Sequence, residues 1–77
     1  MIDKKTVEVL KYIEKHPDIT LSALYDQFGK PVIDSAKKLT EEGLVKEHTS
    51  RQLKSSELEV YSYTISIDGK AYLESID

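Results

Sequence analysis

The chain has 77 residues, no cysteine and a formal net charge of −3. This length allows one hydrophobic core, so we expect a single domain over residues 1–77 with little spare stability. The lack of cysteine excludes a disulfide framework and a thiol nucleophile. No run of eighteen apolar residues occurs, and the opening MIDKKTVEVL lacks the apolar core of a signal peptide. We therefore expect a cytoplasmic protein with no membrane partner.

A first helix is predicted over Lys4–Lys15. Asp3 is a suitable N-cap, because its carboxylate can accept from a free backbone N–H of the first turn. Pro17 ends the segment, since the residue before a proline resists the α conformation. The core-facing stripe of this helix is expected to contain Thr6, Leu10 and Ile13.

Two shorter helices are predicted next. The first lies between an N-cap at Thr20 and a C-cap at Gly29. The second covers residues 30–42, has Pro31 in its first turn and ends at Gly43. The short connection between the two helices forces a sharp angle between them. The apolar stripes are Leu21, Leu24 and Phe28 in the first helix and Val32, Ala36 and Leu39 in the second.

Two strands and a closing helix complete the pattern. Residues 44–49 and 60–65 show the alternation and the β-branched and aromatic content of strands, with a polar loop between them. Gly43 lets the first strand return beside the helices, so the two strands can pair as a hairpin. The closing helix follows an N-cap at Ser66. We expect its core-facing stripe to contain Ile67, Ala71 and Ile76, widened by Tyr72 and Leu73.

Three stretches of this pattern resemble the winged helix-turn-helix domain, most closely that of MarR-like bacterial transcription regulators. TLSALYDQFG is similar to the second helix of that family, and AKKLTEEGLVKEH to the end of its recognition helix and the first wing strand. YTISIDGKAYL is similar to the second wing strand and the closing helix. The resemblance implies an α+β fold in which a three-helix cluster carries a two-stranded β-hairpin wing and a C-terminal helix.

The same resemblance implies a small transcription regulator that binds double-stranded DNA, as a homodimer that reads two half-sites and without a cofactor. The helix over residues 30–42 would then enter the major groove, and the loop over residues 50–56 would be the wing. Backbone N–H groups at the start of the second helix would bind a phosphate. The DNA-contacting residues that the resemblance implies are Thr20, Ser22, Lys30, Ile33, Lys37, Lys38, Arg51, Gln52 and Lys54.

The distribution of charge leaves a second function open. Residues 29–54 carry six basic and four acidic side chains, a local charge of +2, whereas residues 55–77 carry one basic and five acidic side chains, a local charge of −4. A basic face joining Lys30, Lys37, Lys38, Lys46, Arg51 and Lys54 would favour DNA, because phosphate neutralisation supplies most non-specific affinity. A surface broken up by Asp34, Glu41 and Glu47 would favour a protein-interaction or dimerisation module on the same scaffold.

Other chemistry is not indicated by the sequence. His16 and His48 lack the spacing of a metal site, so we predict none. The acidic pairs Glu41–Glu42 and Glu57–Glu59 have no nucleophile or phosphate-binding loop beside them, so we do not expect an enzyme. Tyr61 and Tyr63 could stack on bases, but packing on the face of the hairpin is the preferred interpretation.

Overall fold

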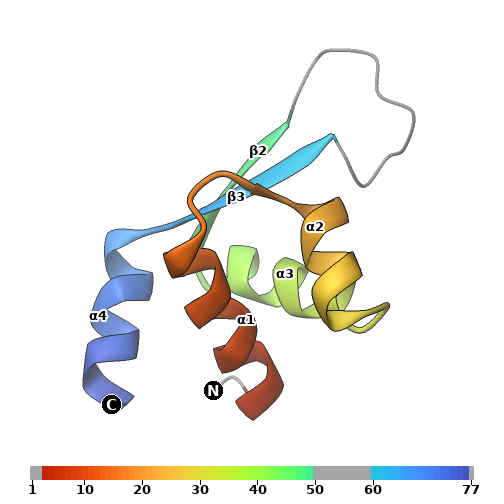
Figure 1. Cartoon of the computed structure of the whole chain (residues 1–77). Helices are drawn as coiled ribbons and strands as arrows, with labels where there is room; N and C mark the ends of the chain where they lie inside the picture. Colours follow the sequence, from red (N-terminus) through yellow and green to blue (C-terminus); the bar gives the residue numbers. More distant parts are fainter. Residues whose placement is uncertain (1–2, 50–59, 77) are drawn as a thin grey trace.

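The computed structural model describes residues 3–49 and 60–76. The elements in chain order are α1 (Lys4–Lys15), β1 (Ile19–Thr20), α2 (Leu21–Phe28), α3 (Val32–Glu41), β2 (Val45–Thr49), β3 (Tyr61–Ile65) and α4 (Ile67–Ile76). They form a small α+β fold with four helices and a three-stranded antiparallel sheet in the described part of the chain. The sheet runs above the helices in the order β1–β3–β2, and α4 lies on the far side of α1 from α2 (Figure 1).

One core joins these elements. Leu10, Ile13, Leu24 and Leu39 are completely buried where α1, α2 and α3 meet. The other buried apolar side chains are Val9, Leu21, Val32, Ala36, Leu44, Val45, Tyr63 and Leu73.

Among residues 3–49 and 60–76, no helix is both long and apolar enough to cross a membrane.

The first helix has the predicted bounds and the predicted cap. The Thr6 N–H donates to Asp3 Oδ1 over 2.9 Å, and hydrogen bonds with Thr6 lower the pKa of Asp3. Thr6 itself is buried, and its hydroxyl donates to Ser35 Oγ of α3 over 3.4 Å. The polar member of the predicted stripe thus links α1 to α3.

The sheet has a third strand that the predicted two-stranded hairpin lacks. In β1, Ile19 pairs with Tyr63 and Thr20 with Ser62. The preceding turn contains Asp18 at a left-handed φ of 60°, and its carboxylate accepts from the Thr64 hydroxyl over 2.9 Å. Two residues are too few to show a strand period, so this strand exists through its tertiary pairing rather than its own sequence pattern.

The second and third helices follow their predicted caps, with one correction. Thr20 Oγ accepts from the Ala23 N–H over 3.1 Å, and Gly29 ends α2 at a φ of 85°. The third helix covers Val32–Glu41 rather than residues 30–42, because Pro31 serves as its N-cap. Proline has no side-chain acceptor for capping, and the Val32 N–H instead donates to the Gly29 carbonyl over 3.1 Å.

The end of α3 is a tight reversal at Gly43. The Gly43 N–H donates to the Thr40 carbonyl and the Leu44 N–H to the Leu39 carbonyl, at 3.1 and 3.0 Å. This pair of bonds is the Schellman arrangement, which requires a left-handed residue after the helix. Gly43 supplies it with a φ of 75°. The chain therefore leaves α3 and enters β2 within three residues.

A second turn, between β3 and α4, is bonded directly to this reversal. The Ser66 N–H donates to the Leu44 carbonyl over 3.1 Å, and the Ser66 hydroxyl donates to the Gly43 carbonyl over 2.7 Å. Ser66 Oγ also accepts from the Gly69 N–H over 3.0 Å, which caps α4 as predicted. We call residues 43–44 and 66–69 the turn junction.

The close approach at the turn junction explains a glycine inside a helix. A Cβ on Gly69 would overlap the Leu44 carbonyl oxygen and lie 2.7 Å from Ile65 Cγ1. Alanine is the better helix former by about 0.5–1 kcal/mol, but only glycine fits where α4 meets the chain leaving α3.

The predicted core-facing stripe of α4 is wrong at Ile67, Ala71 and Ile76 and confirmed at Leu73, with Tyr72 half-buried. Ile67 is 86% exposed, Ile76 is 45% exposed and Ala71 is also exposed, whereas Gly69 and Leu73 are buried. Since a helix has 3.6 residues per turn, the nine positions between Ile67 and Ile76 place them on opposite sides of it. The contact made by Gly69 selects the buried side, and Leu73 follows four residues later on the same side.

We predict that the two glycines of the turn junction differ in their cost of substitution. Gly69→Ala should lower the free energy of unfolding by about 3 kcal/mol, because the added methyl group meets backbone that has no room to move. Gly43→Ala should cost about 1 kcal/mol, because its Cβ would lie in open space and only the left-handed φ is unfavourable. Urea unfolding of both variants measures the difference; equal losses would contradict the close approach at Gly69.

Candidate nucleic-acid interface

The side of α3 that faces away from the core carries most of its charge. Val32, Ala36 and Leu39 are buried, so the opposite side of α3 is exposed. Lys30, which precedes the helix, is exposed as well. We call this surface the outer face of α3, and its exposed side chains are Lys30, Ile33, Asp34, Lys37, Lys38 and Glu41. The sequence correctly predicted which positions point outward, because the helical period is regular over this segment.

The lysines of α3 lie on two flanks of its outer face, about 100° apart around the helix axis. Lys37 lines a hollow between α3 and the strand pair β2–β3. Lys38 lines a different hollow, on the α1 side, together with Asp3. Asp34, four residues before Lys38, also lines the α1-side hollow. Sequence neighbours thus face different directions, and a carboxylate accompanies the lysine on the α1 flank.

The first of these hollows is built by three elements. It has a volume of about 280 Å³, and we call it the α3–hairpin hollow. The start of α2, the outer face of α3 and the core-facing side of β2–β3 each contribute to it. Its lining residues are Leu21, Ile33, Lys37, Glu47, Tyr61 and Tyr63.

A hydrogen bond inside this hollow fixes the hairpin side. Tyr63 is 2% exposed and directly opposite Glu47 in the strand register. The Tyr63 hydroxyl donates to Glu47 Oε2 over 2.8 Å. Burial, followed by the hydrogen bond and the charge of Glu47, raises the pKa of Tyr63 above its usual value of 10. Tyr63 is therefore a core residue, and Tyr61 is half-buried beside it.

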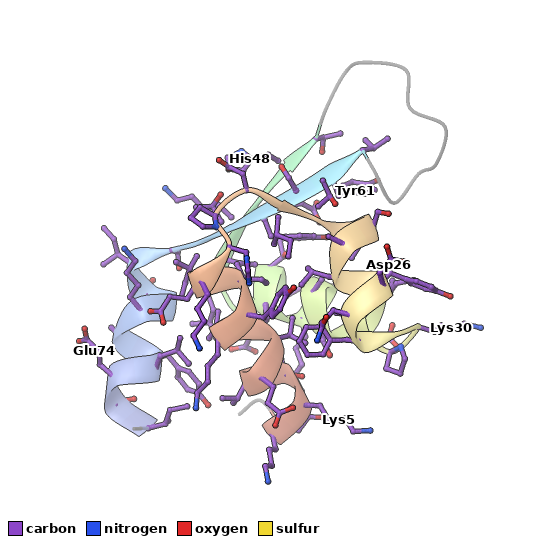
Figure 2. All side chains as sticks on the ribbon, in the orientation of Figure 1. Lys5, Asp26, Lys30, His48, Tyr61 and Glu74 are labelled. Atoms are coloured by element: carbon purple, nitrogen blue, oxygen red, sulfur yellow. The ribbon has the colours of Figure 1, made fainter. Side chains whose placement is uncertain are left out.

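The exposed Lys46 of β2 does not join the lysines of α3. Side chains alternate along a strand, and Val45 of β2 faces the core, so Glu47 shares its side whereas Lys46 and His48 face the other way. Figure 2 shows His48 on the side of the sheet away from the helices. A single basic face that includes Lys46 is therefore absent from the described residues.

The remaining predicted contact residues have different positions. Lys30 is exposed in the turn between α2 and α3 (Figure 2). At the start of α2, Ser22 is half-buried and Thr20 uses its oxygen to cap the helix. The predicted wing over residues 50–56, with Arg51, Gln52 and Lys54, lies outside the described residues.

Sequence reasoning missed the contribution of Leu21 and Glu47 to this site. The strand register would have revealed Glu47, because it lies two residues after the buried Val45 on the same side of the strand. Leu21 was recognised as a core residue, but only the packing of α2 against the sheet brings it to the edge of the hollow.

No group of three side chains suited to metal binding occurs in the described part of the chain. Comparison with protein-family models, with curated proteins and with solved structures gave no significant match to this chain. Function is therefore inferred from the geometry and charge of the outer face of α3 and the α3–hairpin hollow.

The raised pKa of Tyr63 predicts a loss of stability at alkaline pH. The folded protein retains the phenolic proton to a higher pH than the unfolded chain does. The stabilisation is therefore complete below pH 10 and is lost as the pH rises above that value, by at most about 1.4 kcal/mol per pH unit. Urea unfolding between pH 8 and about 11 measures this slope. Tyr63→Phe should flatten it, whereas the control Tyr72→Phe should retain it; an unchanged slope in Tyr63→Phe would contradict the assignment.

Proposed function

We propose that this chain is a winged helix-turn-helix protein that regulates transcription by binding double-stranded DNA, with α3 in the major groove. The observation that carries the proposal is the outer face of α3, which is exposed along its whole length beside the strand pair β2–β3. An α-helix about 10–12 Å wide fits the major groove of B-DNA, which is about 12 Å across.

The positions of the lysines suit this arrangement. A helix lying in the major groove turns its two flanks towards the two phosphate backbones that border the groove and its centre towards the base edges. Lys37 is on the hairpin flank and Lys38 is on the α1 flank, so each can reach a different backbone. The separation of these lysines thus supports binding in a groove.

Some of the acidic side chains lie away from this surface. Asp68 and Glu74 are exposed on α4, which packs on α1. Glu74 and Lys30 lie at opposite sides of the molecule in Figure 2. Near α3, Lys30, Lys37 and Lys38 are accompanied by Asp34, Glu41 and Glu42, so the local charge is about zero rather than −3. Moderate affinity in a single copy is expected, and a two-fold dimer would strengthen binding by engaging two half-sites.

Salt dependence of binding to a random-sequence duplex tests this proposal. Affinity should fall steeply with salt, and Lys37→Ala and Lys38→Ala should each lower the slope of log K against log salt by about 0.9, because each lysine neutralises one phosphate. Asp34→Asn should tighten binding about fivefold at low salt, because a carboxylate near the phosphates is removed.

Two variants on α4 provide matched controls for these changes of charge. Lys70→Ala and Glu74→Gln alter exposed side chains on α4 and should leave both the affinity and the slope unchanged. If the α4 variants changed binding as much as the α3 variants, the assignment of α3 would be wrong.

A second candidate function, a protein-interaction module, is favoured by two observations. The predicted basic face is broken up, because Lys46 faces away from α3 and because Asp34, Glu41 and Glu47 are exposed. The α3–hairpin hollow contains Leu21, Ile33 and the ring of Tyr61, which could receive an apolar side chain of a partner. Absence of binding to duplex DNA even at low salt would support this function in place of the first.

A further inference from the structure

The side chains that α3 lacks limit which bases it can recognise. Arginine is the favoured reader of guanine, and asparagine or glutamine reads adenine, in each case through two parallel hydrogen bonds. The segment Val32–Glu41 contains none of these three residue types. Lysine also reads guanine, but the proposed function places Lys37 and Lys38 on phosphates, which leaves α3 no side chain assigned to a purine.

The hydroxyl groups of α3 are already engaged within the fold. The Thr40 hydroxyl donates to the Ala36 carbonyl over 2.8 Å. Ser35 Oγ accepts from Thr6 of α1, and both hydroxyl-bearing residues of α3 are half-buried. Neither side chain extends from the outer face.

The exposed, uncommitted side chains near the start of α3 are Ile33 and Asp34. Ile33 is 38% exposed and is the large apolar residue on an otherwise charged face. Ile33 also lines the α3–hairpin hollow, as Lys37 does. Residues near the N-terminus of a recognition helix are those that reach the base edges.

The chemistry of these two residues matches the pyrimidines. The 5-methyl group of thymine is the apolar group that bases display in the major groove, and an aliphatic side chain contacts it favourably. The N4 amino group of cytosine is a donor that a carboxylate accepts.

We propose that α3 reads pyrimidines, with Ile33 on the 5-methyl group of a thymine and Asp34 on the N4 amino group of a neighbouring cytosine. This inference depends on the proposed function, since it requires α3 to lie in the major groove. It also explains why a carboxylate is retained on the outer face of α3: Asp34 weakens non-specific binding and discriminates among base pairs.

Replacement of thymine by uracil tests this reading without altering the protein. A duplex is first selected from a random library by the wild-type chain, and each of its thymines is then replaced singly by uracil, which removes the methyl group alone. At one thymine per half-site we expect affinity to fall about fourfold, the effect of one methyl group leaving an apolar contact. Ile33→Ala should bind the thymine and uracil duplexes equally.

The Asp34→Asn variant tests the second contact with the same library. Its selected sites should carry adenine in place of cytosine at one position, because asparagine pairs with adenine N6 and N7. Melting curves of both variants establish that they are folded.

Three results would overturn the inference in distinguishable ways. The role of Ile33 would be refuted if replacing thymine by uracil changed the affinity at no position. It would also be refuted if Ile33→Ala still bound the thymine duplex more tightly than the uracil duplex. Binding at low salt without enrichment of any sequence would refute base reading while leaving the proposed function in place. No binding of any duplex at low salt would refute both.

Discussion

The hydrogen bonds of Ser66 to Gly43 and Leu44 join two turns that are distant in sequence. One turn releases the chain from α3 into β2, and the other releases it from β3 into α4. Joining them fixes the angle between α3 and the strand pair, because β2 begins and β3 ends at these joined turns. Gly69 lets α4 close over this point. The relative position of the outer face of α3 and the hairpin depends on this turn junction.

The surface that results is mixed in charge, and its arrangement matters more than its sum. Lysines occupy the two flanks of α3, Asp34 and Glu41 accompany them, and Glu47 is held by Tyr63 within the α3–hairpin hollow. Against a flat partner surface, these positive and negative charges would nearly cancel. In the proposed complex a groove would separate them, because the long lysine side chains would reach phosphates while the shorter Ile33 and Asp34 would approach base edges. The geometry therefore makes DNA binding compatible with an acidic chain.

The parts of the fold that sequence predicted are those that local chemistry determines. Asp3, Thr20, Gly29 and Gly43 cap or end helices through contacts within a few residues, so the bounds of α1 and α2 follow from the sequence. The parts that it missed depend on tertiary contacts. β1 exists through pairing with β3, and the buried side of α4 is chosen by the packing of Gly69 rather than by its apolar residues. The exposure of the predicted site residues followed from helical periodicity, but their division between two flanks required the packing of α3 against α1 and the sheet.

The central claim is that the outer face of α3, fixed by the turn junction beside the hairpin, is the surface that contacts DNA. Titration of isotopically labelled protein with a duplex at low salt, followed by the backbone amide signals, tests this claim most directly. We expect the shifted signals to cluster at the start of α2, along α3 and at the ends of β2 and β3 away from the turn junction, with α4 unchanged. Shifts concentrated on α4, or none on α3, would contradict the account.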